Sequence, residues 1–458
     1  RLYDDAQAHL EDIKRDLRRA SPMRRVLTGE VGAGKGKLAL LAAAMVADAK
    51  SQVLVLGSDP VEAETRFMHT EPLLREGGLV ARLVQTPPTR PQLDAIKRGE
   101  VHVVFGTLDL LEQPVEYRRL GLVIAIERES FGRVGVLHAA LPAPRPDLLV
   151  STAIPVGPRV LLTAYADHHV SVVVDPERRP ARIELCRADE RPAAYQQVRD
   201  AVASGDQALI VFPMVDGADA IDLPDALRLV RVLEAEAFAG LRVGLLHGGI
   251  PRDDRLRVHE DFVHRRIDVL VCTTRIEDGP TVPGAVVVVI EQADRVDQWR
   301  LHRIIGFMSR SRRVQEPGEE RTPARAILIV GELAEPDAAA RIHRVVGAPN
   351  GFQLTEALVQ LRGVDRAVAA GAAPLPQFDW FELDNDLPLL LRAREEAHRV
   401  LRADPQLRRG SHADLGRELR ARWDRLFVGG ADRGWVCPIR DDAPVEPKRR
   451  RRRRRRRR

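Results

Sequence analysis

Short apolar runs alternate with longer amphipathic segments along most of this chain. In the first part, runs that are wholly or mainly apolar lie at residues 23–27, 53–56, 101–105, 120–126 and 148–150. Runs of this kind are typical of strands buried on both faces, and helical segments between them allow the strands to be parallel. The pattern therefore predicts a parallel sheet with helices on both faces. An amphipathic helix over residues 2–20 is expected to precede it.

The same pattern begins again in the second part of the chain. There the apolar runs lie at residues 208–213, 241–247, 267–272, 285–290 and 326–330. They predict a second parallel-sheet domain. The proline- and arginine-rich stretch 175–192 is interpreted as the connection between the two domains.

Beyond about residue 335 the pattern becomes helical. The best helix candidates lie at residues 338–346, 355–361 and 387–401. The sequence therefore predicts an α/β protein with two tandem parallel-sheet domains, a helical C-terminal region and a disordered basic tail. The predicted segments are residues 1–185, 186–335, 336–446 and 447–458.

Length and composition agree with several domains. The chain has 458 residues, 44% hydrophobic and 30% charged, which is enough to bury two or three cores. It has no apolar run of about 18 residues and no signal peptide, so we expect a cytoplasmic protein without a membrane partner. The three cysteines are far apart, which argues against a disulfide framework or a zinc site.

The net charge of +6 has its origin at the C-terminus. Residues 448–458 carry 11 positive charges, and the remaining chain has 61 basic against 66 acidic residues, a balance of −5. Such a run repels itself and binds polyanions by releasing their counterions. It is either a DNA- or RNA-binding arm or a repetitive stretch with incidental affinity for polyanions.

The clearest chemical motif follows the first predicted strand. Gly29, Gly34 and Lys35 have the spacing G-x-x-x-x-G-K of a phosphate loop, and an alanine-rich helix follows. Glycines there let backbone N–H groups surround phosphate oxygens, and the lysine reaches the outer phosphates. We predict nucleotide contacts from Gly29, Gly32, Gly34, Lys35 and Gly36. The alternative is a glycine-rich turn from strand to helix.

The next position of the motif departs from its usual chemistry. Serine or threonine normally follows the lysine, and its hydroxyl is a direct ligand of the magnesium ion that bridges the outer phosphates. Here the residue is Gly36, which has no side chain to offer. The loop therefore predicts ATP binding without a complete magnesium site.

Two tandem parallel-sheet domains, the first opening with a phosphate loop, are the layout of helicase motors. The chain resembles the bacterial RecG family of branched-DNA helicases over about residues 1–405. The matching stretches are residues 29–35, 106–107, 163–167, 243–248, 272–277, and 350–352 with 361–363. The resemblance implies RecA-like domains, ATP and Mg²⁺ as cofactors, a monomer, and duplex or branched DNA as partner. The family's wedge domain is expected to be absent.

The resemblance also implies roles for single residues. Glu127 would orient the attacking water, and Arg310 would meet the γ-phosphate from the second domain. Thr107, Thr274 and Arg362 would contact DNA. The alternative role of the two threonines is to cap the helices that follow them.

Several positions depart from the family's pattern. The aspartate expected before Glu127, which in the family holds magnesium through its water shell, is Ile126, and one of the two arginines expected near Arg310 is Phe307. The coupling motif Thr-Ala-Thr reads Thr-Ala-Ile at residues 152–154. One lost arginine finger alone costs roughly 10³–10⁵ in turnover.

Three functions remain open from the sequence. The first is a DNA-binding relative of RecG with impaired ATP hydrolysis, a pseudo-helicase of DNA repair or recombination. The second is an active ATP-dependent branched-DNA helicase whose altered motifs are compensated. The third is a non-catalytic scaffold for protein interactions. An ATPase assay with and without forked DNA separates the first two.

Overall fold

The computed structural model describes residues 4–112, 115–127, 144–165, 167–175, 181–213, 223–273, 285–308, 324–331, 336–348, 350–362 and 386–427. The chain divides into two compact units, one of residues 1–138 with 143–372 and one of residues 139–142 with 373–458. Both predicted parallel-sheet domains lie in the first unit. Among the described helices, none is long and apolar enough to cross a membrane.

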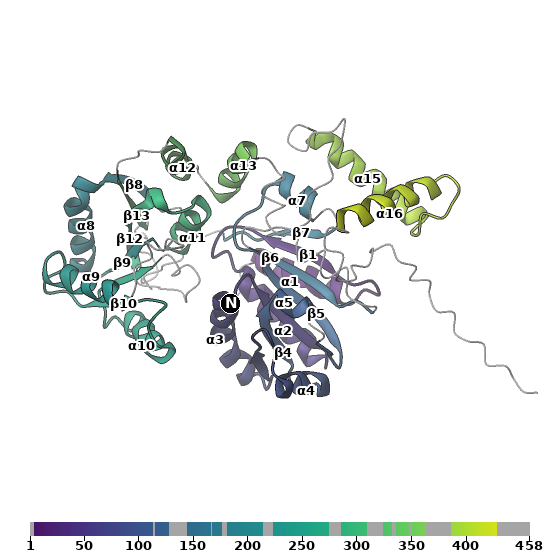
Figure 1. The fold of residues 1–458 in the computed structure, drawn as a ribbon, viewed down its shortest axis with the longest axis horizontal. Helices are drawn as coiled ribbons and strands as arrows, with labels where there is room; N and C mark the ends of the chain where they lie inside the picture. Colours follow the sequence, from purple (N-terminus) through teal and green to yellow (C-terminus); the bar gives the residue numbers. More distant parts are fainter. Residues whose placement is uncertain are drawn as a thin grey trace, which may run out of the picture. The chain divides into compact units, whose positions relative to one another are not determined.

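The first sheet is parallel, as predicted. Within the described residues its strand order is β3-β4-β2-β5-β6-β1-β7. Figure 1 shows β1, β6 and β7 of this sheet close together. The strands are β1 (Arg24–Thr28), β2 (Gln52–Gly57), β3 (Ala81–Leu83), β4 (Val103–Thr107), β5 (Leu120–Glu127), β6 (Asp147–Thr152) and β7 (His169–Val172). Because β1 pairs with β6 on one side and β7 on the other, the strand that leads into the phosphate loop is fixed on both sides.

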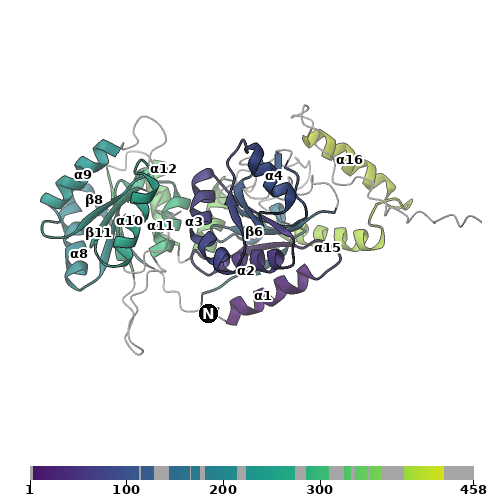
Figure 2. The ribbon, with the colours of Figure 1, turned by 90° about the horizontal axis from the view of Figure 1, so that it is seen from below.

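Helices connect and cover the strands of this sheet. They are α1 (Asp4–Leu17), α2 (Lys35–Asp48), α3 (Pro60–Glu76), α4 (Arg90–Arg98), α5 (Asp109–Glu112) and α7 (Pro158–Ala164). Leu10 and Ile13 of α1 share a core cluster with Leu38 of α2, and Figure 2 shows the two helices beside each other. The predicted N-terminal amphipathic helix is therefore confirmed, with ends at Asp4 and Leu17.

The second sheet is also parallel, in the order β10-β11-β9-β12-β13-β8 within the described residues. The strands are β8 (Arg182–Arg187), β9 (Gln207–Phe212), β10 (Val243–Leu246), β11 (Val269–Thr273), β12 (Ala285–Ile290) and β13 (Arg325–Val330). Side chains alternate between faces along a strand. Val288 and Ile290 of β12 accordingly join one core cluster, while Val287 and Val289 join another. Burial on both faces explains why this strand is apolar throughout.

The helices of the second domain lie between these strands, except that the last two follow β13. They are α8 (Arg191–Ala203), α9 (Leu223–Ala235), α10 (Arg252–Val263), α11 (Gln298–Met308), α12 (Pro336–Gly347) and α13 (Gly351–Arg362), with the short 3₁₀ turns η1 (Ala188–Glu190) and η3 (Ala293–Arg295). The predicted fold class, two tandem RecA-like parallel-sheet domains, is confirmed by this arrangement.

One sequence interpretation was wrong. The stretch 175–192 is not only a connection, because β8 lies within it, pairs with β13 and belongs to the second sheet. The predicted boundary between residues 185 and 186 falls inside this strand. β8 is an edge strand in which Arg182 and Glu184 alternate with Ile183 and Leu185, so it lacks the continuous apolar run of the strands that were predicted. The short strands β3 and β7 were also not predicted.

The described part of the second unit consists of two helices, α15 (Leu387–Ala403) and α16 (Ala413–Phe427). Asp404 organises the turn between them, because its carboxylate accepts hydrogen bonds from the backbone N–H groups of Arg408 and Arg409 at 3.1 and 2.9 Å. The predicted helix at residues 387–401 is confirmed, whereas α16 was not predicted. The basic tail at 447–458 lies outside the described residues.

Candidate functional site

The phosphate loop joins the end of β1 to the start of α2. Gly29, Gly32 and Gly34 have φ angles of 146°, 93° and 101°, in the region that favours glycine. A Cβ atom at Gly29 would lie 2.1 Å from the carbonyl oxygen of Val173, so the loop passes directly against the chain after β7. The space beside Gly34 is open within the described part of the structure. The loop thus has the backbone form of a phosphate cradle.

Lys35 begins α2 and is held over this loop. Its side chain is largely buried, with 7% of the residue exposed, and Nζ donates to the carbonyl oxygens of Gly29 at 2.5 Å and Glu30 at 2.8 Å. These bonds place the ammonium group at the cradle, where a bound phosphate would compete for it. The five residues predicted to contact nucleotide are therefore brought together in one loop and one helix turn. We call residues 29–35 the phosphate half of the site.

The two positions expected to carry magnesium ligands face one cavity of about 50 Å³. Gly36 in the first turn of α2 and Ile126 near the end of β5 both line it, and Ile126 is 8% exposed. The other lining residues are Ala39, Leu40, Ala43, Val55, Arg66, Thr70, Leu74, Phe105, Ile124 and Ser151. We call Gly36, Ile126 and this cavity the metal corner.

The metal corner does not fit a magnesium ion. Mg²⁺ prefers oxygen ligands, and in nucleotide sites it is held by carboxylates together with phosphates. Gly36 has no side chain, Ile126 presents hydrocarbon, and no carboxylate among the described residues lines the cavity. Ser151 and Thr70 contribute neutral hydroxyl groups, and the Thr70 hydroxyl donates to the carbonyl oxygen of Arg66 at 2.6 Å. The incomplete magnesium site expected from the sequence stays a prediction.

The structure describes only the backbone of one of the two residues expected to catalyse hydrolysis. Glu127 ends β5 in register with Thr152 of β6, but its side chain lies outside the description. Arg310 lies beyond the described end of α11 at Met308. Both roles remain predictions.

Of the residues expected to contact DNA, the structure describes some more fully than others. Thr107 ends β4, and its hydroxyl lies 3.4 Å from Oδ2 of Asp109, a carboxylate that would repel a phosphate. Arg362 is the last residue of α13, with its side chain outside the description, and Thr274 lies outside the described residues. Thr107 therefore has a local polar partner, and its contact with DNA stays a prediction.

Two helices of the second domain contact the phosphate loop, and sequence reasoning missed the residues that do so. In α11, a Cβ atom at Gly306 would lie 2.8 Å from Cβ of Val31, and Nε2 of His302 lies 3.4 Å from Oε2 of Glu30. The backbone N–H of Gly351, at the start of α13, donates to Oε1 of Glu30 at 2.7 Å. The glutamate inside the G-x-x-x-x-G-K motif is the signal that could have indicated such a partner.

α13 also contacts the loop that follows the coupling motif. The hydroxyl of Thr355 donates to the carbonyl oxygen of Pro155 at 2.6 Å, and a Cβ atom at Gly157 would lie 2.7 Å from Oε2 of Glu356. Within the motif, the buried Thr152 hydroxyl donates to the carbonyl oxygen of Ile154 at 2.7 Å. The loop that follows the altered motif is thus packed against α13.

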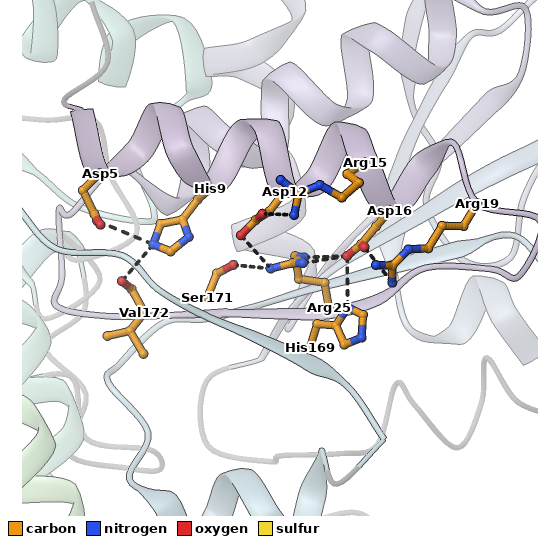
Figure 3. Close-up of polar contacts among 10 residues, drawn as sticks. All are labelled: Asp5, His9, Asp12, Arg15, Asp16, Arg19, Arg25, His169, Ser171 and Val172. Atoms are coloured by element: carbon orange, nitrogen blue, oxygen red, sulfur yellow. Dashed lines mark hydrogen bonds and ion pairs between the residues drawn. The ribbon is translucent and has the colours of Figure 1, made fainter. Parts of the chain in front are cut away.

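A buried ion pair fixes the other end of β1 (Figure 3). Nη2 of Arg25 lies 2.6 Å from Oδ2 of Asp16 in α1, and Nη1 donates to the hydroxyl of Ser171 in β7 at 2.6 Å. Only 7% and 3% of the Arg25 and Asp16 side chains are exposed. Burial opposes ionisation of Asp16, but hydrogen bonds from Arg25 and His169 outweigh it and lower the pKa of this carboxyl group. The pair holds α1, β1 and β7 together behind the phosphate loop.

Comparisons with known proteins agree with this architecture. Residues 193–315 match the helicase conserved C-terminal domain. The chain is 29% identical over 435 residues to the ATP-dependent DNA helicase RecG of Synechocystis sp., covering 94% of this chain and 51% of that protein. It is 30% identical over 403 residues to RecG of Thermotoga maritima, covering 86% of this chain and 50% of that protein. The chain therefore spans about half the length of the curated relatives it matches.

Solved structures give the same result. A structure of RecG bound to a three-way DNA junction matches with a TM-score of 0.56 and 27% identity, covering 85% of this chain and 50% of that one. The DEAD-box helicase Mss116 bound to ssRNA and UDP-BeF matches with a TM-score of 0.55 at 14% identity, covering 72% of this chain and 70% of that one, which supports the fold alone.

Proposed function

Because this chain contains a superfamily-two helicase core related to RecG, we propose that it binds DNA as a RecG-type core with impaired magnesium-dependent ATP hydrolysis. Its role would be in DNA repair or recombination. The relatives are named as ATP-dependent DNA helicases, and the similar structure holds a three-way junction, so duplex or branched DNA is the partner we propose. We further propose that the protein acts as a monomer in the cytoplasm.

The apolar metal corner carries the proposal of impaired hydrolysis. Phosphoryl transfer depends on a metal ion that neutralises the developing charge between the outer phosphates. Gly36 and Ile126 present no oxygen from their side chains to the cavity where that ion is needed. The phosphate half, in contrast, keeps its positive-φ glycines and Lys35. This combination favours binding of nucleotide over turnover.

The deciding experiment is an ATPase assay of the full chain with and without forked DNA. At saturating ATP and DNA, we expect turnover at least about three orders of magnitude below that of an ordinary motor, the low end for one lost arginine finger. A Lys35→Ala variant provides the background. Turnover near that of an ordinary motor, stimulated by DNA and lost in Lys35→Ala, would favour instead an active helicase with compensated motifs.

Restoring the altered positions should recover part of the activity. Gly36→Thr, Ile126→Asp and Phe307→Arg act on one metal-phosphate centre, so their effects are not additive. We expect the triple variant to hydrolyse ATP measurably above background and each single variant to stay at background. Recovery by one substitution alone would contradict the proposal that several ligands are missing.

We propose that the arginine tail supplies non-specific affinity for polyanions. Without residues 448–458 the chain carries a balance of −5, so the remaining affinity has to come from local groups. For the full chain we expect a log–log salt slope of up to roughly −0.9 per phosphate contacted on duplex DNA. A chain ending at Pro447 should show a much flatter slope and should prefer forked over plain duplex DNA. Loss of all DNA binding in that variant would favour a protein-interaction scaffold.

A further inference from the structure

Arg66 of α3 projects into the metal corner. We propose that its guanidinium takes the place of the magnesium ion, so that the phosphate half binds nucleotide without a divalent metal. This inference rests on the proposed nucleotide binding and adds a specific requirement to it. The ligand is a nucleoside triphosphate or diphosphate in its metal-free form, and Arg66 is a positioning and specificity residue for the outer phosphates.

The distance between Arg66 and position 36 supports this placement. Nη1 of Arg66 lies 3.4 Å from the point where a Cβ atom at Gly36 would be. A magnesium ion bound to a serine or threonine hydroxyl lies roughly 3–3.5 Å from that Cβ atom, because metal–oxygen distances are about 2.0–2.1 Å. The cation of Arg66 is therefore as far from position 36 as the missing ion would be.

The shared cavity indicates in which direction the Arg66 guanidinium points. Arg66 lines the same cavity as Ile126, which stands where the family's motif has its metal-binding aspartate. An aspartate at 126 would bring a carboxylate to a cavity that already contains a guanidinium. Leucine, valine and isoleucine side chains elsewhere in the lining provide a low-polarity surrounding that strengthens the attraction between a cation and a phosphate. The loss of both magnesium ligands and the presence of Arg66 thus concern one small volume.

A buried carboxylate fixes the orientation of Arg66. Nη2 of Arg66 lies 3.3 Å from Oε1 of Glu62, one helix turn earlier, and 4% of the Glu62 side chain is exposed. The other oxygen of Glu62 accepts hydrogen bonds from the backbone N–H and the hydroxyl of Ser58, at 2.9 and 2.7 Å. The side chain of Arg66 itself is 41% exposed, so a ligand can reach it. Glu62 engages Nη2 and leaves Nη1 directed toward position 36.

The chemistry of arginine suits this role. A guanidinium stays charged at all physiological pH values and binds phosphate oxygens through a planar set of N–H donors. It carries one charge where magnesium carries two, and it cannot exchange with solvent. It can therefore hold the phosphates of a nucleotide, while it lacks the second charge and the ordered water ligands that a metal supplies during hydrolysis.

The test is a calorimetric titration of ATP into the full chain, once with Mg²⁺ and once with EDTA. We expect the two dissociation constants to differ by less than about threefold, the range of a weak electrostatic interaction. Arg66→Ala should weaken binding by about 10- to 100-fold in EDTA, as expected for loss of charge-assisted hydrogen bonds. Arg66→Lys, which keeps the charge, should retain part of the affinity.

Arg75→Ala is the matched control, because Arg75 lies on the same helix and pairs with Glu71 at 3.5 Å with the same spacing, but it is not among the residues that line the cavity. It should leave ATP affinity unchanged. The triple variant Gly36→Thr/Ile126→Asp/Arg66→Ala should bind ATP only with Mg²⁺. Thermal melting of each variant checks that it folds.

The outcomes separate this inference from the proposed function. ATP binding that requires Mg²⁺ in the unaltered chain would overturn the role of Arg66 and leave nucleotide binding intact. Unchanged affinity in both Arg66→Ala and Arg66→Lys would do the same. Absence of ATP binding in both Mg²⁺ and EDTA would overturn nucleotide binding itself.

Discussion

The phosphate half and the metal corner lie within one helix turn of each other and differ in how they are built. The phosphate half is made of backbone, with left-handed glycines, and Lys35 bound to two carbonyl oxygens of its own loop. The metal corner depends on side chains. Gly36 has no side chain where the family's motif has a hydroxyl, and Ile126 has a hydrocarbon side chain where the motif has a carboxylate. Backbone geometry has been kept where side-chain chemistry has changed.

Coupling to the core explains this difference. Gly29 passes so close to Val173 that any residue with a Cβ atom would clash with the backbone there. The conformation of the loop is therefore constrained by its packing against the chain that follows β7. Position 36 is exposed at the start of a helix and can change without disturbing the core. If the proposed function holds, the fold retains the form of a nucleotide site at which catalytic groups have been replaced.

The largest effect is expected from Asp16→Ala, which would remove the support behind β1. Removing one partner of a buried ion pair costs about 3–5 kcal/mol, and Arg25 would keep the more distant Asp12 and the hydroxyl of Ser171 as partners. We expect this loss in the free energy of unfolding measured by urea denaturation. Asp12→Ala is the control, because Asp12 is 36% exposed and 3.9 Å from Arg25, and it should cost no more than about 1 kcal/mol. Equal costs for the two variants would show that the Asp16–Arg25 pair does not hold β1.

The same pair predicts a dependence of stability on pH. The pKa of Asp16 is lower in the folded chain than in the unfolded chain, so its contribution is fully present above the unfolded value of about 3.9. The contribution is lost as the pH falls through the lower, folded pKa. Unfolding measured between pH 7 and pH 3 should therefore show a smaller loss of stability at acid pH in Asp16→Asn than in the unaltered chain. Parallel curves would contradict this.

Gly29→Ala should have the next largest effect. Alanine at this φ angle carries strain and clashes with the carbonyl oxygen of Val173, so we expect a loss of about 2–4 kcal/mol in unfolding free energy. Gly34→Ala meets open space in the described structure and should cost about 1–2 kcal/mol from its backbone conformation alone. A larger cost at position 34 than at 29 would mean that the loop is not fixed by its packing on β7.

Lys35→Ala acts on binding. Hydrogen bonds to charged groups contribute about 1.5–3 kcal/mol, so ATP affinity should fall by about 10- to 100-fold. Lys37→Ala, an exposed position in the same helix, should leave affinity unchanged. Equal effects of the two substitutions would place the nucleotide elsewhere.

Gly36→Thr should be the mildest change. Its Cβ atom would meet only the flexible end of Arg66 at 3.4 Å, and threonine is a somewhat better helix residue than glycine, so stability should change by no more than about 0.5 kcal/mol. A large destabilisation would show that position 36 is as tightly constrained as position 29.

The strands with continuous apolar sequence could be predicted, and the edge strands β3, β7 and β8 could not. β12 is buried on both faces, so its composition alone identifies it. β8 mixes arginine and glutamate with apolar residues because it lies at an edge, and the edge strands β3 and β7 likewise contain arginine, histidine or serine between their apolar residues. Such strands form because they pair with a strand that is distant in sequence, as β8 pairs with β13.

The candidate site was predictable where it is local in sequence. The spacing of Gly29, Gly34 and Lys35 located the cradle, and the identities of residues 36 and 126 led to the prediction of an incomplete metal site. Arg66 could not be found in this way, because it reaches position 36 only through the tertiary fold, in which α3 packs on β2, β3 and β4. The contact of Glu30 with Gly351, 321 residues apart, likewise depends on the tertiary fold.

The decisive observation is the chemical state of nucleotide bound to the full chain. Excess protein is incubated with labelled ATP and forked DNA, the complex is separated from free nucleotide, and the bound label is identified. If the cradle binds and the metal corner does not support hydrolysis, the complex contains intact ATP, and Lys35→Ala reduces the amount bound. Recovery of ADP in the complex of the unaltered chain, at a rate typical of a helicase motor, would contradict the separation of the two halves.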